Sequence, residues 1–126
     1  MSTLTVSNIS DATTTVGTSY VVNGSAKAYA NWDNDSTLTD TLNVSSGTDN
    51  GTGNARLNLT NDMSSGTYIF NGVCLGAANT TTAVYEGTNS YTASRVDYNT
   101  TIHTSGSTTI SLNDFDSLTV VHGDLA

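Results

Sequence analysis

The two histidines of this chain are the side chains best suited to acid–base chemistry, and they lie far apart in the sequence. His103 is in the segment TTIHTS and His122 is in VVHGD. A histidine can act as a general base toward a serine, and serines are plentiful here. However, no G-x-S-x-G motif places a nucleophile, and no Cys or His spacing indicates a zinc site. We therefore interpret both histidines as surface residues at strand ends, and predict no catalytic residue and no enzymatic activity.

Two short acidic segments raise the question of calcium binding. Asp33 and Asp35 begin like an EF-hand loop, but the glycine expected at the sixth position and the glutamate expected at the twelfth are missing. Asp40 follows nearby, and Asp114 and Asp116 form a second acidic segment, NDFDS. A looser calcium site on a β-turn stays open for both segments. The alternative is that both are polar turns without a cation. The sequence assigns no metal site and no cofactor.

The composition argues against several classes of partner. Only 11% of the residues are charged, against about 25% in an ordinary soluble domain, and the net charge is −8. The three basic residues, Lys27, Arg56 and Arg95, are far apart in sequence. Because binding to nucleic acid requires clustered Lys and Arg, it is not expected. No apolar run approaches the roughly 18 residues of a membrane span, so no membrane insertion is expected. The N-terminus lacks the basic and apolar segments of a secretion signal.

The secondary structure that would position the histidines and aspartates consists of strands. Thr, Ser, Val, Tyr and Asn dominate the chain and favour strands and turns. No segment keeps a helical apolar stripe, and Gly recurs at predicted turns. We expect an all-β fold, an antiparallel β-sandwich or jelly-roll-like domain of about 7–9 short strands with essentially no helix. Residues 1–18, rich in Thr, are predicted to be an N-terminal arm or first strand that serves attachment. Residues 19–126 are predicted to form a single sandwich domain.

Four segments carry specific structural predictions. Residues 19–32 are expected to form a long extended segment, in which Asn23-Gly24 could introduce a bulge or bend. The pair Asn50-Gly51 predicts a hairpin, because both residues tolerate positive φ angles. Residues 54–60 alternate apolar and polar side chains, which is typical of a half-buried strand. Residues 67–75 are apolar on both faces and are predicted to form a central strand buried on both sides. The single cysteine, Cys74, is in that strand, so it is expected to be a buried thiol without a disulfide.

One strand face consists of small residues next to the only tryptophan. Ala26, Ala28, Ala30 and Trp32 alternate with polar residues. We expect this face to let two layers or two subunits approach closely, and we identify it as the candidate oligomer interface. A separate set of aromatic residues could stack on sugar rings, although aromatic residues also fill β cores. The candidate glycan contacts are Tyr85, Tyr91 and Tyr98.

Two segments together resemble a module of tailed-bacteriophage structural proteins, often from marine phages, that is common in tail-fibre-like proteins. They read VNGSAKAYANWDN and LNVSSGTDNGTGNARLNLTNDMSSGTY, and the resemblance covers about residues 22–68. The chain departs from the family pattern at Tyr29, where the family has Trp, at Trp32, where it has Phe, and at Ser64, where it has Pro. The resemblance implies a structural domain of the virion that is commonly trimeric.

This resemblance and the residues lead to two functional hypotheses. The first is a non-enzymatic structural protein of the virion, exposed on the particle as a capsid decoration protein or a short fibre or appendage. It would be a homotrimer bound to other capsid or tail proteins, assembled in the host cytoplasm and released by lysis. The alternative is a carbohydrate-binding module at a tail-fibre tip that recognises a host-surface glycan. A depolymerase is disfavoured, because no pair of carboxylates can be placed as a glycosidase requires.

Overall fold

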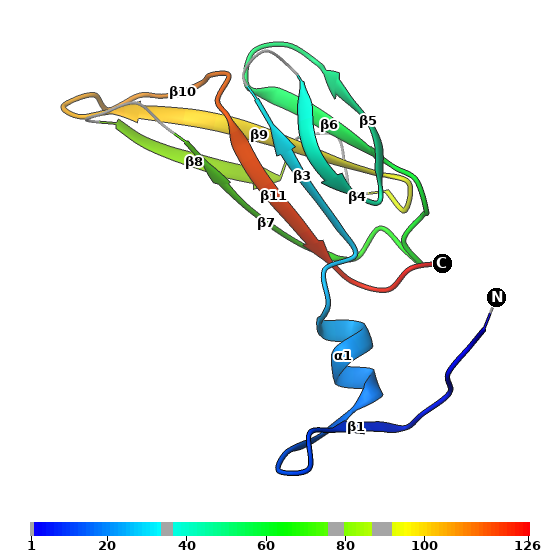
Figure 1. Ribbon diagram of the computed structural model, residues 1–126. Helices are drawn as coiled ribbons and strands as arrows, with labels where there is room; N and C mark the ends of the chain where they lie inside the picture. The colour runs from blue at the N-terminus through cyan, green and yellow to red at the C-terminus, as the bar shows by residue number, and fades with distance from the viewer. Residues whose placement is uncertain (1, 34–36, 76–79, 87–91) are drawn as a thin grey trace.

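The computed structural model describes residues 2–33, 37–75, 80–86 and 92–126, and it confirms the predicted all-β fold (Figure 1). Within these residues there are eleven strands and one short helix. The elements in chain order are β1 (Asn8–Ser10), β2 (Thr15–Gly17), α1 (Thr18–Gly24), β3 (Ala28–Trp32), β4 (Leu38–Leu42), β5 (Val44–Asp49), β6 (Asn54–Leu59), β7 (Ile69–Cys74), β8 (Thr80–Glu86), β9 (Arg95–Thr104), β10 (Ile110–Leu112) and β11 (Ser117–His122).

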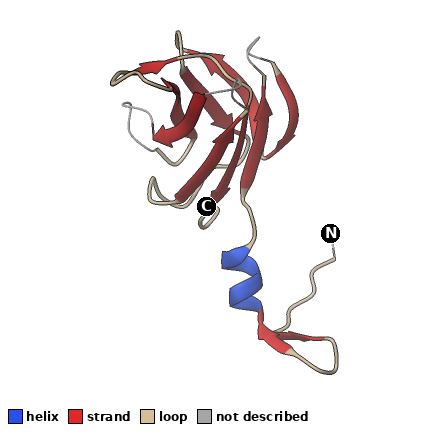
Figure 2. Cartoon of the chain, turned by 90° about the vertical axis from the view of Figure 1, so that its left-hand side faces the viewer, coloured by secondary structure: helices blue, strands red, loops and turns tan. Residues whose placement is uncertain are grey.

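Strands β3 to β11 form a sandwich of two antiparallel sheets (Figures 1 and 2). The first, which we call the β11 sheet, has the order β4-β3-β11-β7. The second, the β9 sheet, contains β5, β6, β9, β8 and β10. Strands β6 and β10 pair with successive parts of one edge of β9, because β8 overlaps both of them in register and must occupy the other edge.

Side chains that alternate along the strands fill the space between the two sheets. In β6, Ala55, Leu57 and Leu59 are buried and the residues between them are partly exposed, which confirms the prediction of a half-buried strand. In β11 the alternation places Ser117, Thr119 and Val121 inside. The core contains Ala28, Ala30, Trp32, Val44, Ala55, Leu57, Leu59, Met63, Tyr68, Val96, Tyr98 and Val121.

The hairpin predicted at Asn50-Gly51 is also confirmed. It joins β5 to β6, and the Asn50 and Asn54 backbones close it through hydrogen bonds of 2.8 Å from Asn50 N to Asn54 O and from Asn54 N to Gly51 O. Gly51 has a φ angle of 110°, a conformation that glycine adopts without steric cost.

The expectation of a long extended segment over residues 19–32 is wrong for its first part, which α1 occupies, and correct for its second part, which is β3. The helix is one short element with no buried residue, so no apolar stripe in the sequence could reveal it. Residues 2–24, which we call the arm, contain β1, β2 and α1 and extend beyond the end of the sandwich at which β3 begins (Figures 1 and 2). The boundary between arm and sandwich therefore falls near residue 24 and not at residue 18.

The prediction for residues 67–75 is partly wrong as well. Strand β7 lies at the edge of its sheet and not at the centre. Its inner side chains, Phe70 and Cys74, face the core, whereas Ile69 and Val73 on its outer side are 70% and 53% exposed. The strand is apolar on both faces, but the chain itself covers only one of them.

Candidate functional site

The candidate oligomer interface lies inside the subunit. Ala28, Ala30 and Trp32 are all buried between the two sheets, and Ala26 is half-buried just before β3. For the three buried residues the prediction of an interface between subunits is therefore wrong, since the chain's own second sheet covers them; for Ala26 it stays a prediction. The part of the expectation that concerned two layers is correct, because the small side chains let the β9 sheet pack closely against β3.

The candidate glycan contacts are not brought together as a site. Tyr98 is 0% exposed, shares a hydrogen bond of 3.0 Å with the Ser117 hydroxyl, and stacks on Phe70 at 5.7 Å between ring centroids. Burial raises the pKa of Tyr98 to about 12. Tyr98 is a core residue, so its prediction as a glycan contact is wrong. Tyr85 lies in β8 opposite Asn99, and nothing is described of its side chain. Tyr91 lies outside the described residues.

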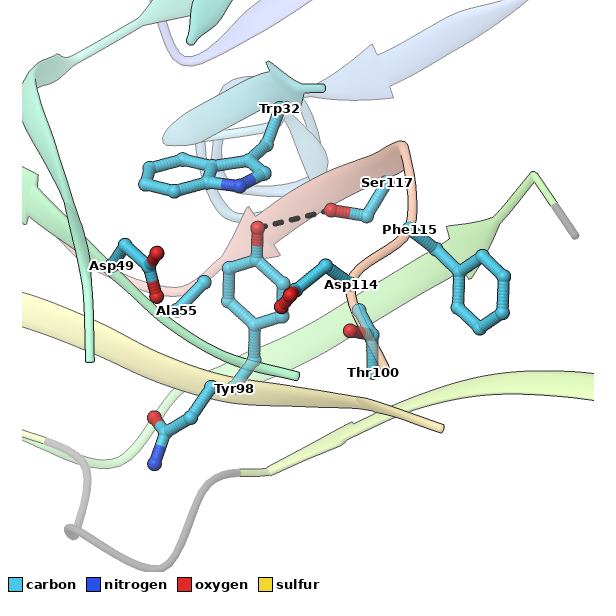
Figure 3. Close-up of a pocket in the computed structure, with 9 residues that line it drawn as sticks. Trp32, Asp49, Ala55, Tyr98, Thr100, Asp114, Phe115 and Ser117 are labelled. Atoms are coloured by element: carbon cyan, nitrogen blue, oxygen red, sulfur yellow. Dashed lines mark hydrogen bonds between the residues drawn. The ribbon is translucent and has the colours of Figure 1, made fainter. Parts of the chain in front are cut away.

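A small cavity at one end of the sandwich is lined by Trp32, Tyr98 and Ser117, with Asp49 and Asp114 at its rim (Figure 3). Its volume is about 10 Å³, which is room for about one water molecule. A small-molecule substrate needs several hundred Å³. The cavity is therefore a packing gap with a polar lining and not a substrate pocket.

The aspartates considered for calcium binding help to close loops. An Asp33 carboxylate oxygen accepts a hydrogen bond of 2.9 Å from Thr37 N in the β3–β4 turn. An Asp114 oxygen accepts one of 2.6 Å from Gly53 N. Asp40 lies on the outer face of β4 and accepts a long hydrogen bond of 3.4 Å from the Tyr29 hydroxyl. Asp35 lies outside the described residues, and Asp116 is near the start of β11. Among the residues that the structure describes, no group of three acidic, histidine or cysteine side chains could hold a metal ion.

The two histidines lie in different sheets. His103 is in β9 opposite Ile110, and His122 ends β11 opposite Ile69. Cys74 is buried, as predicted, and burial raises its pKa to about 11. The thiolate is the nucleophilic form of cysteine, so at neutral pH this thiol is unreactive.

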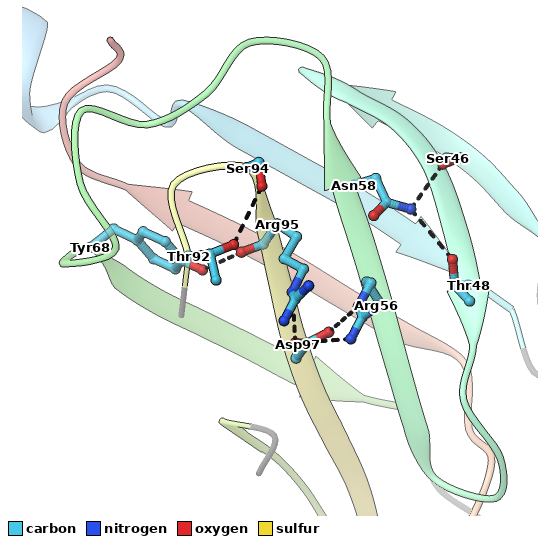
Figure 4. Close-up of polar contacts among 9 residues, drawn as sticks. All are labelled: Ser46, Thr48, Arg56, Asn58, Tyr68, Thr92, Ser94, Arg95 and Asp97. Carbon is cyan, nitrogen blue, oxygen red and sulfur yellow. Dashed lines mark hydrogen bonds and ion pairs between the residues drawn. The ribbon is translucent and has the colours of Figure 1, made fainter. Parts of the chain in front are cut away.

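The outer face of the β9 sheet carries a buried ion-pair cluster (Figure 4). Asp97 is 2% exposed and lies 2.6 Å from Arg56 Nε and 3.2 Å from Arg95 Nε. The Tyr68 hydroxyl donates a hydrogen bond of 2.8 Å to the backbone oxygen of Arg95. The hydrogen bond from Arg56 to Asp97 raises the pKa of the guanidinium above its ordinary value. Two of the three basic residues of the chain are therefore paired with one buried carboxylate, in a cluster that ties β6 to β9.

The outer face of the β11 sheet carries several exposed apolar side chains, a feature that sequence analysis missed, with the polar residues Asn31, Asp40, Asn71 and His122 among them. A shallow groove of about 320 Å³ crosses β7 and β11, lined by Asn71, Gly72, Val73, Leu118, Thr119 and Val120. Other apolar side chains extend this surface across the sheet. We call it the β11 face and define it by Tyr29, Leu42, Ile69, Val73, Leu118 and Val120. The signal was present in the sequence, because residues 67–75 are apolar on both faces.

The arm is the second apolar surface that sequence analysis missed. Leu4 is 85% exposed and Tyr20 is 77% exposed. None of the seven residues of α1 is buried. The arm exposes Leu4, Val6, Ile9, Val16, Tyr20, Val21 and Val22. The arm was predicted from its Thr-rich composition, whereas the structure shows that the apolar side chains it does contain are uncovered.

No protein family, no curated protein sequence and no solved structure matches this chain. Among the described residues, no helix combines the length and the apolar character needed to cross a lipid bilayer.

Proposed function

We propose that the chain is a non-enzymatic structural subunit of a tailed-phage particle, exposed on its surface as a capsid decoration protein or a short fibre domain. The observation that carries this proposal is the arm, which leaves the sandwich and presents apolar side chains to solvent. Large exposed apolar surfaces on a soluble protein are typical of protein–protein contacts. The subunit is a homotrimer that also binds other virion proteins, in agreement with the resemblance of residues 22–68 to phage tail-fibre modules.

The arm has too little internal support to be stable alone. Strands β1 and β2 pair over three residues each, and an isolated two-stranded hairpin is marginal in water. A helix of seven residues is far below the roughly 12–15 residues at which isolated helices become even marginally stable. A partner that covers the arm would provide the missing contacts. An assembling structural protein has such a partner by definition.

The interior of the sandwich supports a structural role. Asp33 and Asp114 close turns, Asp97 holds two arginines, and the end cavity has room for about one water molecule. These polar groups stabilise a rigid domain. The low charged fraction and abundant hydroxyl groups suit a surface that stays exposed to the medium for long periods.

The test is to purify phage particles from a lysate that contains this protein and to identify particle proteins by mass spectrometry. We expect the protein to band with intact particles in a density gradient and to be labelled on their surface by gold-conjugated antibodies. The same lysate depleted of particles is the control. Recovery of the protein only in the depleted lysate would contradict the proposal.

A further inference from the structure

We infer that the arm of one copy docks on the β11 face of a second copy, so that subunits assemble head to tail by exchanging arms. This inference rests on the proposed structural function and names the two surfaces that carry it. Both surfaces belong to the same chain, and both are apolar and exposed. Each surface needs a second apolar surface to cover it, and the arm and the β11 face can cover each other.

The composition of the two surfaces fits a contact between like-charged copies. The chain carries a net charge of −8, so two copies repel each other at long range. The arm contains a single charged residue, Asp11, whose pKa is lowered to about 2 by hydrogen bonds from the Thr14 and Thr13 backbone and the Thr13 hydroxyl. That carboxylate is already engaged in its own turn. The arm is thus a nearly neutral segment that can approach another acidic copy.

The extent of the arm suits a stable interface. Standard protein–protein interfaces involve roughly 20–30 residues from each partner. The arm, residues 2–24, is close to the lower end of that range, and nearly all its residues are exposed. On the sandwich, the β11 face spans all four strands of its sheet and includes the groove between β7 and β11.

Lys27 fixes the joint between arm and sandwich. Its backbone N–H donates a hydrogen bond of 2.8 Å to Val121 O, which attaches it to β11. Its ammonium group donates hydrogen bonds to Val22 O and, at 2.7 Å, to the Ser25 hydroxyl, at the end of α1. A cation at a helix C-terminus is favourable. Lys27 thus holds the arm in a direction that leads beyond the end of its own sandwich (Figures 1 and 2), where a second copy could receive it.

The two surfaces are different, so the contact is heterologous, and such contacts close into rings when the rotation between neighbours permits it. A ring of three copies agrees with the proposed homotrimer. In this ring every arm is covered and every β11 face is occupied. The same contact explains why β7 and β11 carry apolar side chains on both of their faces.

The test uses two full-length double variants with complementary defects. The arm variant, Leu4→Ser with Tyr20→Ser, keeps its β11 face but has a disabled arm. The face variant, Ile69→Ser with Val73→Ser, keeps its arm but has a disabled face. All four side chains are at least half exposed within the subunit, so both variants should keep the β-sheet circular dichroism spectrum and a cooperative unfolding transition. Their melting temperature should fall only by the contribution of assembly. A matched control, Ile110→Ser with Leu112→Ser, removes two exposed apolar side chains of β10 instead.

Light scattering after size exclusion gives the masses. We expect the wild type and the β10 control to form the same closed oligomer, and each variant alone to have the mass of one chain, 13.1 kDa. An equimolar mixture of the two variants restores one arm-to-face contact and should form a dimer of one chain of each. A second face variant, Leu118→Ser, should behave like the first.

Three results would overturn the inference: a monomeric wild type, variants that assemble like the wild type, or a mixture that stays monomeric. These results concern only the arm-to-face contact. The proposed virion role would still depend on whether the protein bands with particles, so the two can fail separately.

Discussion

The indole ring of Trp32 lies directly against the backbone of Gly47, on the opposite sheet. A Cβ atom added to Gly47 would fall 1.8 Å from a ring carbon of Trp32 and within 2.8 Å of two others. This pair explains the small-residue face of β3. The close approach is between the two sheets of one subunit, and only a glycine in β5 leaves room for the tryptophan.

Gly47→Ala should therefore destabilise the sandwich by about 3 kcal/mol, because the Trp32 ring must leave its place in a closely packed core. Urea unfolding followed by tryptophan fluorescence measures this loss. The control is Gly24→Ala, at the end of α1, where an added Cβ meets nothing within 4 Å and the φ angle is ordinary. An equal and small effect of both substitutions would contradict the packing described.

The sequence predicted the parts of the fold that depend on local patterns. The alternation of β6 and the Asn-Gly turn before it are set by neighbouring residues, so they could be recognised directly. Helix α1 could not be predicted, because it has only seven residues and packs on nothing within its own subunit, so no apolar stripe marks a buried side. The small-residue face of Ala28, Ala30 and Trp32 indicated close packing. It did not indicate whether a second sheet of the same subunit or a second subunit packs against it. For β7, an apolar outer face looks the same in sequence whether the same chain or another copy covers it.

Asp97→Asn should lower the free energy of unfolding by about 2 kcal/mol. It leaves Arg56 and Arg95 facing each other across β6 and β9 without the shared negative charge. The effect is smaller than for a fully buried pair, because both guanidinium groups are partly exposed. Urea unfolding at low salt gives the value. Asp40→Asn, on an exposed side chain, is the matched control and should change stability by less than about 0.5 kcal/mol. A loss no larger than the control's would show that the cluster is not stabilising.

Stability should be constant from neutral pH to about 9 and then fall as the pH rises. In the folded chain burial raises the pKa of Cys74 from 9.0 to about 11 and that of Tyr98 from 10.0 to about 12. Between each pair of values the unfolded state loses a proton that the folded state keeps, so deprotonation favours unfolding. The stability that each group contributes is fully present below its pKa in the unfolded state. It is lost as the pH rises to its pKa in the folded state.

Urea unfolding at pH 7, 9, 10 and 11 measures this profile. Cys74→Ala should reduce the loss of stability between pH 9 and 10, and Tyr98→Phe should reduce the loss above pH 10. The single lysine and the other five tyrosines are common to the wild type and both variants, so the comparison isolates the contributions of Cys74 and Tyr98. A wild-type profile that stays flat through pH 11 would show that these two groups are accessible in the folded chain.

Lys27→Met should weaken assembly while leaving the sandwich intact. The methionine keeps the apolar stem but cannot donate to Val22 O or Ser25, so the arm loses its fixed direction. An ordered arm binds more tightly than a disordered one, because less conformational freedom is lost on docking. Sedimentation of a dilution series should show dissociation at a protein concentration about 10-fold higher than for the wild type. An unchanged dissociation constant with an unchanged melting temperature would contradict the claim that Lys27 orients the arm for docking.

The absolute mass of the intact chain, measured by light scattering after size exclusion at two concentrations, tests the central claim that copies of this chain assemble with one another through the arm and the β11 face. The account predicts a stable mass near three times 13.1 kDa at both concentrations. A mass of 13.1 kDa at both concentrations would contradict it, because the arm and the β11 face would then remain uncovered in solution.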